Sequence, residues 1–250
     1  MPTFRSMLSP AAHRPLARTV RFGILSTFPP TACGLASFSS ALAASLSSRG
    51  SEVSVVRIAD GSSSSDGRVV AELVNGSSLS SAACVESLNE HEAVIIQHDY
   101  DLYGGTHGDE LLTILGGLRV PSIVVVHNVM KDPAPHQRWV LEQVTTMAGR
   151  VVVMSEVACE RLCREYAVDR RKIVTIPHGA SLPTQPRGKR TSRPIILTCG
   201  LLGPGKGVER VIDVMPALAS VAGRPRYLVA GQTHPRVAVR EGEAYREARI

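Results

Sequence analysis

The chain has 250 residues, of which 44% are hydrophobic and only 4% aromatic, so its size and composition allow a core built mainly from aliphatic side chains. The formal net charge of +6 comes from scattered basic residues without interleaved aromatics. This disfavours a nucleic-acid partner and is compatible with an anionic substrate or an anionic membrane surface. Five irregularly spaced cysteines predict neither a zinc site nor a disulfide framework, as expected of a reducing compartment such as the cytoplasm.

The N-terminal stretch, residues 1–18, contains Arg and Ser but no apolar segment of the kind that a secretory signal requires. We expect it to be a disordered extension. No stretch of the chain approaches the roughly 18 consecutive apolar residues of a membrane span.

From Thr19 onward, short Val- and Ile-rich runs alternate with helical patterns. The expected strands are 19–26, 52–58, 93–97, 122–126, 151–154 and 172–176, and the expected helices are 35–50, 108–118, 136–148 and 156–167, the last capped by Ser155. Residues 60–81 are rich in Ser and Gly and indicate a flexible loop. This order predicts an N-terminal Rossmann-like domain over 19–179, with a doubly wound parallel sheet.

A Pro-rich and charged segment, 180–194, indicates a linker to a second α/β unit over 195–250. Its expected strands are 195–199 and 226–230, and its expected helices are 207–222 and 236–249. Two strands and two helices do not enclose a core of their own, so this unit is expected to be an incomplete domain.

The second unit carries "GLLGPGKG", in which Gly200 to Lys206 follows the spacing of an ATP-binding P-loop. Gly207 stands where a P-loop has the Ser or Thr that holds Mg²⁺, and Pro204 has no N–H to donate, so an ATPase is disfavoured. The loop still joins an apolar strand to a helix, and helix N-termini collect anions. Gly205 and Lys206 are therefore candidate phosphate-binding residues, the alternative being a solvated lysine.

Polar and glycine residues follow the expected strands, at the edge where open parallel sheets bind ligands. Gly34 opens the first helix and would let a ligand approach the backbone, although it could also be a turn residue only. His127 is a candidate ligand contact or a hydrogen-bonded structural histidine. The remaining candidates for an acceptor or a cleft at this edge are His98, Asp99, Tyr100 and His178, and Gly231, after the second strand of the second unit, is a further candidate for binding the donor phosphate.

These segments resemble the retaining, nucleotide-sugar-dependent glycosyltransferases of family 4, which have the two-domain GT-B fold. The similarity runs in the family's order over most of the chain. It is carried by "STFPPTACGLASFSSALAASL", "VIIQHDYDLYGG", "VVVHNV", "VVVMSEVACERL", "KIVTIPHG", "GLLGPGKGVERVIDVMPAL" and "YLVAGQTHP".

The resemblance implies that the loop bearing Gly34 lies against the donor diphosphate, that His127 contacts the transferred sugar, and that Lys206 neutralises the leaving group. A hexose would move from a nucleoside diphosphate sugar to a glycan or lipid acceptor hydroxyl with retained configuration. No metal or other cofactor would be needed, because Lys206 and helix N–H groups stabilise the leaving charge.

Two departures from the family pattern are expected to matter. Leu201 stands where many members have an arginine, and the chain ends at Ile250 before the family's paired glutamates. The sequence therefore leaves open a truncated, catalytically inactive remnant or a sugar-nucleotide-binding protein, and more distantly a P-loop nucleotidase.

Overall fold

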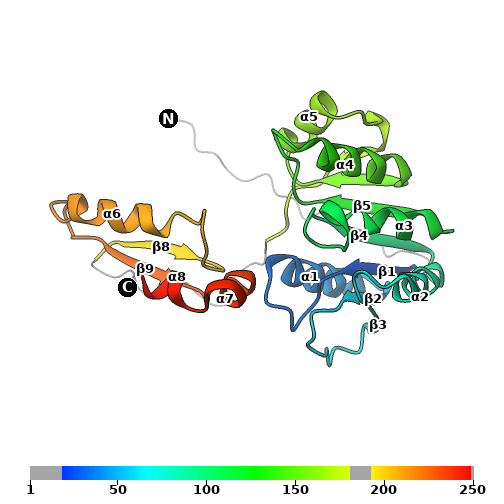
Figure 1. The fold of residues 1–250 in the computed structure, drawn as a ribbon, viewed down its shortest axis with the longest axis horizontal. Coiled ribbons are helices and arrows are strands. Elements are labelled where there is room, and N and C mark those ends of the chain that lie inside the picture. The colour runs from blue at the N-terminus through cyan, green and yellow to red at the C-terminus, as the bar shows by residue number, and fades with distance from the viewer. Residues whose placement is uncertain (1–18, 181–192, 249–250) are drawn as a thin grey trace. The chain divides into compact units, whose positions relative to one another are not determined.

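The computed structural model describes residues 19–180 and 193–248, apart from the side chains of residues 235 and 236. The chain divides into two compact units, the first ending at Gly179 and the second beginning at Ala180 (Figure 1). The expected extension over 1–18 and most of the expected linker over 180–194 lie outside the described residues. None of the described helices combines the length and the hydrophobicity that crossing a bilayer requires.

The first unit is built on a seven-stranded, all-parallel sheet with the strand order β3-β2-β1-β4-β5-β6-β7, which confirms the predicted α/β fold class. The strands are β1 (Arg21–Ser26), β2 (Glu52–Ile58), β3 (Val69–Leu73), β4 (Ala93–His98), β5 (Ser122–Val126), β6 (Arg150–Val153) and β7 (Ile173–Thr175). The helices are α1 (Gly34–Ser48), α2 (Ser78–Asn89), η1 (Thr106–Gly108), α3 (Glu110–Gly117), α4 (Pro135–Met147), α5 (Glu156–Glu165) and η2 (Arg170–Lys172).

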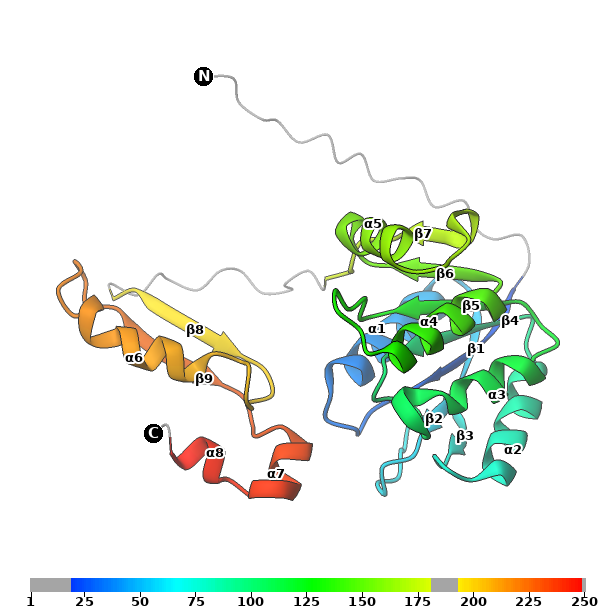
Figure 2. The ribbon, with the colours of Figure 1, turned by 45° about the horizontal axis from the view of Figure 1, so that its top comes forward.

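The two faces of the sheet carry different helices. Successive residues of a strand point to opposite faces, so Ile24 packs in the cluster under α1 whereas Leu25 packs in the larger cluster under α2 to α5. Figure 2 shows α1 on the side of the sheet opposite to α2, α3 and α4. The central strands of the sheet are therefore buried on both faces, as Val- and Ile-rich parallel strands require, whereas the edge strands β3 and β7 each expose a valine.

The expected flexible loop over 60–81 was wrong, because β3 and the first turn of α2 lie within it. The strand β3 is a short edge strand whose residues alternate between half-buried and exposed, so it lacks a continuous apolar run. The helix α2 reads "SLSSAACVESLN" and buries Ser81, Cys84, Val85 and Leu88 against its neighbours. Tertiary burial and the Ser77 side chain, which accepts a hydrogen bond from the backbone N–H of Ser80, hold a helix that serine content disfavours.

The second unit consists of the parallel pair β8 (Ile195–Cys199) and β9 (Arg226–Ala230) with α6 (Val208–Leu218), α7 (Pro235–Glu241) and α8 (Ala244–Glu247). Its described core is the small cluster of Leu202, Val208, Val237 and Tyr245. The expected single helix over 236–249 is two helices, because Gly242 lies between them with a left-handed φ of 61°. The expected helix over 207–222 ends at Leu218.

One fully buried cation ties the loops after β1 and β2 together. The Arg57 side chain has no solvent exposure, so each of its N–H groups needs a partner. The guanidinium donates hydrogen bonds to the backbone carbonyls of Phe28 and Ser62 and to the side chains of Thr31, Asp60, Ser62 and Glu72. This cluster, the Arg57 network, fixes the loop that leads into α1.

The carboxylate of Asp60 belongs to the Arg57 network and is stabilised in its charged form. Partial burial alone would raise its pKa, but hydrogen bonds from Ser62, Thr31 and Arg57 hold that pKa well below its usual range. The pKa of Asp60 is lower in the folded than in the unfolded protein, so charged Asp60 stabilises the fold above about pH 4, and this stabilisation is lost as the pH falls.

We predict that Arg57→Met destabilises the first unit by about 3 kcal/mol, since it removes the buried donor that two carboxylates and two backbone carbonyl groups share. Urea unfolding followed by circular dichroism measures the change. The matched control is Arg171→Ala, whose side chain is 90% exposed and pairs with Asp169, and which should leave the free energy of unfolding nearly unchanged. Equal losses in the two variants would contradict the role given to the network.

Candidate functional site

The chain connections of the first sheet reverse direction between β1 and β4, and the carboxyl ends of these strands are neighbours. In open parallel sheets such a reversal leaves a crevice at the carboxyl edge where ligands bind. The loop that leads to Gly34 follows β1, the segment containing Asp99 and Tyr100 follows β4, and His127 follows β5. The parallel register therefore gathers most of the predicted first-unit residues at one edge.

Gly34 is the first residue of α1, and the space next to its backbone is open. Cys33 caps the helix, and its sulfur accepts a hydrogen bond of 3.3 Å from the backbone N–H of Ala36. A Cβ atom at Gly34 would meet no other atom within 4 Å. The glycine is thus not required by packing, and its backbone lies open at a helix N-terminus, where an anion is favoured.

His127 is held on three sides. Its backbone N–H donates to the carbonyl of His98 at 3.1 Å, its Nε2 lies 2.7 Å from Oε1 of Gln97, and its ring packs edge-on against Phe38 at 5.1 Å between centroids. Phe38 also contacts the exposed His178 ring at 5.2 Å. Phe38 on α1 thereby brings together two histidines that follow different strands, β5 and β7.

Burial keeps His98 and His127 neutral at physiological pH. Desolvation is the larger cause, and the charge of the nearby His178 the smaller one, that lower the pKa of His127 to about 4. Desolvation, followed by the nearby His127, likewise lowers the pKa of His98 to about 4. A neutral imidazole has one N–H donor and one acceptor nitrogen, so His127 can exchange hydrogen bonds with hydroxyl groups without adding charge.

His98 and Tyr100 are buried in the first unit, with 1% and 2% of their surfaces exposed, and their rings lie 5.3 Å apart. Neither ring nitrogen of His98 has a hydrogen-bond partner among the described residues. Asp99 is half-buried between them. His98 and Tyr100 therefore lie buried beneath this edge of the sheet, and the residues that reach its surface include Asp99, His127, His178 and the backbone at Gly34.

In the second unit, two loops at the carboxyl ends of β8 and β9 are bonded to each other. The backbone N–H of Leu202 donates to Gln232 at 2.8 Å, and the N–H of His234 donates back to Leu202 at 2.7 Å. A Cβ atom at Gly231 would collide with the carbonyl oxygen of Gly200, so only glycine allows this approach. Gly231 thus shapes the loop that carries Gly205 and Lys206.

Lys206 is exposed, and within the described parts of the chain its side chain has no hydrogen bond or ion pair. Gly205 and Gly207 flank it with left-handed φ angles of 88° and 74° and open space where side chains would be. Gly207 is the N-cap of α6 and provides no side-chain cap. An unpaired lysine beside an uncapped helix N-terminus is suited to a phosphate group.

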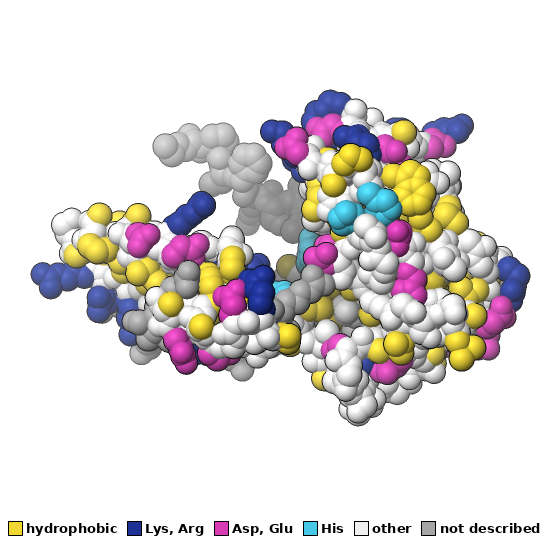
Figure 3. Space-filling view, in the orientation of Figure 1, with side chains coloured by type: hydrophobic (Ala, Val, Ile, Leu, Met, Phe, Trp, Pro, Cys, Tyr) yellow, Lys and Arg dark blue, Asp and Glu magenta, His cyan; other side chains and the backbone are white. Residues whose placement is uncertain are grey.

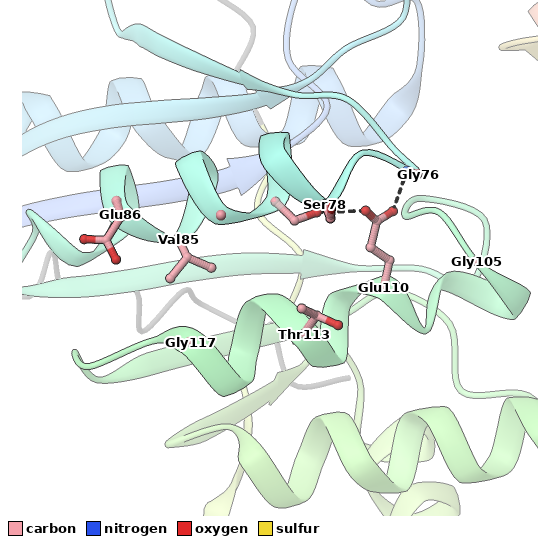
Figure 4. Close-up of a pocket in the computed structure, with 10 residues that line it drawn as sticks. Gly76, Ser78, Val85, Glu86, Gly105, Glu110, Thr113 and Gly117 are labelled. Carbon is pink, nitrogen blue, oxygen red and sulfur yellow. Dashed lines mark hydrogen bonds between the residues drawn. The ribbon is translucent and has the colours of Figure 1, made fainter.

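A separate groove of about 540 Å³ lies between α2 and α3 and contains none of the predicted residues (Figure 4). Small side chains line it, and the carboxylate of Glu110 accepts hydrogen bonds from the backbone N–H of Gly76 at 2.9 Å and the hydroxyl of Ser81 at 2.8 Å. The carboxylate therefore already has partners within the protein.

Histidine side chains also gather over α4 in Figure 3. The Nδ1 atoms of His107 and His136 are 3.4 Å apart, and the His136 ring packs against Trp139. Over residues 19–180 and 193–248, no group of three or more His, Cys, Asp or Glu side chains is arranged to hold a metal ion.

The sequence analysis missed Gln97, Phe38 and Arg57 as residues that shape the site. Gln97 is a polar residue inside the strand run "AVIIQ", and Arg57 interrupts "EVSVVRI" in the same way. A polar side chain at a strand position that must be buried requires a partner, and this signal could have identified both. Phe38 has no such signal, because it is an ordinary apolar residue of an amphipathic helix.

Comparison with known protein families matches residues 33–182, more than half of the chain, to Glycosyltransferase Family 4. The chain belongs to Glycosyltransferase Family 4. The matched range includes Gly34 and His127 but ends before Lys206. No curated protein sequence matches the chain.

Solved structures with a similar fold include an α-glucosyltransferase in complex with UDP-glucose and DNA containing an abasic site. It is 13% identical with a TM-score of 0.59, and the match covers 91% of this chain and 61% of that one. A glycosyltransferase from Rickettsia africae ESF-5 is 14% identical with a TM-score of 0.56, covering 92% of this chain and 65% of the other. The likeness shows the GT-B type of fold, and this chain spans less than two thirds of the length of each.

We predict that Gly231→Ala destabilises the second unit by about 3 kcal/mol, because its Cβ would collide with Gly200 and separate the two loops. Gly242→Ala is the matched control, since it has a left-handed φ but no atom within 4 Å, and should cost about 1 kcal/mol. Hydrogen exchange read by mass spectrometry localises the effect, with the first unit as internal reference. Equal protection in the two variants would contradict the close approach.

Proposed function

We propose that this protein transfers a hexose from a nucleoside diphosphate sugar to an acceptor hydroxyl with retained configuration. The observation that carries the proposal is the loop of the second unit, where the unpaired Lys206 lies beside the uncapped N-terminus of α6. Membership of the family supports glycosyl transfer as the reaction class. The polar residues at the carboxyl edge of the first sheet, which could bind a sugar, also support glycosyl transfer.

In this proposal Lys206, Gly205 and the loop shaped by Gly231 bind the donor diphosphate. Within the first unit taken by itself, the open backbone at Gly34 is proposed as a place where N–H groups can meet a diphosphate. The positive charge and the N–H donors stabilise the negative charge that develops on the leaving diphosphate. That role needs neither a metal nor another cofactor. His127 contacts the transferred sugar as the neutral hydrogen-bonding group at the carboxyl end of β5.

The proposed acceptor is a glycan or a lipid, held at the carboxyl edge where Asp99 and His178 lie. The scattered basic residues argue against nucleic acid. The fold itself does not argue against it, because the compared α-glucosyltransferase was solved with DNA. A cytoplasmic protein that contacts the membrane surface would fit the lipid alternative and the positive net charge.

Lys206→Ala should weaken the binding of nucleoside diphosphates about 10- to 100-fold, the effect of losing one charge-assisted contact of about 1.5–3 kcal/mol. Isothermal titration calorimetry with UDP and GDP identifies the preferred nucleotide and measures the loss. Arg226→Ala is the matched control, because it removes the same charge at the first residue of β9. That residue lies at the amino end of the β8–β9 pair, whereas the Lys206 loop follows the carboxyl end. If Lys206→Ala binds as the wild type does, the diphosphate role is excluded.

His127→Ala should lower the affinity for the nucleotide sugar about tenfold, as expected for one lost hydrogen bond, and leave the affinity for the nucleotide alone unchanged. Titrations with UDP-glucose or GDP-mannose and with the matching nucleotide separate the sugar from the diphosphate. His91→Ala, at the amino edge of the sheet, controls for loss of a histidine, and thermal melting controls for folding. An unchanged ratio of the two affinities would leave His127 structural. Wild-type binding without transfer would favour the alternative of a non-catalytic nucleotide-sugar-binding protein.

A further inference from the structure

The contact between Gln97 and His127 follows from the register of the sheet. Gln97 lies opposite Val125 in the β4–β5 pair, and His127 follows Val125 by two residues. Side chains two residues apart on an extended strand point to the same face, so His127 and Gln97 meet beyond the end of the ladder. Their side chains are 2.7 Å apart between Nε2 of His127 and Oε1 of Gln97.

Gln97 has little freedom to move. It has no solvent exposure, its backbone lies within β4, and its carbonyl accepts a hydrogen bond of 2.7 Å from the hydroxyl of Tyr103. Its side-chain Nε2 has no partner among the described residues, so the hydrogen bond to His127 is the only one that holds the amide. A buried polar residue inside an apolar strand is costly unless its hydrogen bonds serve a purpose.

The chemistry of the two groups determines where the proton of His127 lies. A neutral imidazole carries one proton, on either Nδ1 or Nε2, and the partner of one nitrogen decides which form is stable. The Oε1 atom of Gln97 can only accept a hydrogen bond, so Nε2 of His127 must donate it. Nδ1 then retains its lone pair and is an acceptor.

We propose that Gln97 is the positioning residue of His127, holding it in the Nε2–H tautomer so that Nδ1 accepts a hydrogen bond from a hydroxyl of the donor sugar. The inference rests on the proposed function, which assigns His127 to the sugar. It adds the direction of that hydrogen bond and a residue that acts only through His127. This arrangement resembles the way in which a carbonyl or carboxylate fixes the tautomer of a metal-bound or catalytic histidine.

The neighbouring titratable groups support the neutral form. Two histidines interact electrostatically with His127: His178 lowers the pKa of His127, and His127 lowers the pKa of His98. Each interaction disfavours a second positive charge beside the first. The pKa of His127 is lowered to about 4 by burial and by His178. At neutral pH His127 is therefore uncharged, and Gln97 determines which of its two ring nitrogens carries the single proton.

The first test needs no variant of Gln97 and no nucleotide. Nuclear magnetic resonance of the protein labelled with ¹⁵N- and ¹³C-histidine distinguishes the two tautomers by the shifts of the ring nitrogens. The His127 signals are those missing from the spectrum of His127→Asn. We expect the Nε2–H form at pH 7, and an Nδ1–H form as the major species would overturn the proposal.

The second test changes the partner. Gln97→Glu places a carboxylate against Nε2–H, which stabilises the imidazolium, so the pKa of His127 should rise by about 1–3 units. Gln143→Glu, on α4 and outside this hydrogen bond, makes the same change of charge and should leave that pKa within a few tenths of a unit. A pKa of His127 that is the same in Gln97→Glu and in the control would overturn the proposal. If the buried carboxylate prevents folding, the tautomer of the wild type still decides.

These readouts separate the failure of this inference from the failure of the proposed function. Both are measured on the free protein, whereas the role of His127 in sugar binding is measured by the ratio of nucleotide-sugar to nucleotide affinity. In Gln97→Glu that ratio should fall as the pH drops below the raised pKa of His127 and recover at pH 8 or above, as the imidazolium loses its proton and Nδ1 becomes an acceptor again. A ratio unaffected by His127→Ala, with the Nε2–H tautomer present, would reject the proposed sugar-binding role of His127 but keep Gln97 as the residue that positions it.

Discussion

The parallel register of the seven-stranded sheet is the constraint on which the first unit depends. Because all strands run in the same direction, their carboxyl ends share one edge, and the reversal between β1 and β4 lies at the place where open parallel sheets bind ligands. The same register places Gln97 within reach of His127 and puts the Arg57 network under the loop that leads to Gly34. The candidate site is thus a consequence of strand pairing rather than of any single motif.

Burial then decides how the polar groups at this edge behave. Desolvation lowers the pKa values of His98 and His127 to about 4, so both rings are neutral donors and acceptors at physiological pH. Neutral rings suit sugar hydroxyl groups, which need hydrogen bonds and carry no charge. In the second unit Lys206, the residue proposed to bind the diphosphate, is instead exposed, as a cation that binds a diphosphate needs to be.

The second unit is organised by glycines rather than by a large core. Gly231 allows the loops after β8 and β9 to touch, and Gly205 and Gly207 give the Lys206 loop its left-handed turns. The N-terminus of α6 is left without a side-chain cap, so its N–H groups remain donors. The distance in sequence between Gly200 and Gly231 conceals this contact, which the parallel pairing of the two strands creates.

The sequence alone determined the α/β class, most strands and the cap at Ser155, and it placed Gly34, His127 and Lys206 beyond the carboxyl ends of strands, because these features follow from local periodicity and from glycine and polar residues at strand ends. It did not predict β3 or α2. The strand β3 is short and lacks a continuous apolar run, and α2 is rich in serine, so both are held by burial against other elements. Nor did it identify Gln97 and Arg57 as positioning groups or reveal that His98 and Tyr100 lie below the surface. These properties depend on which side chains meet across strands far apart in sequence, and that is decided only by the register and layering of the folded sheet.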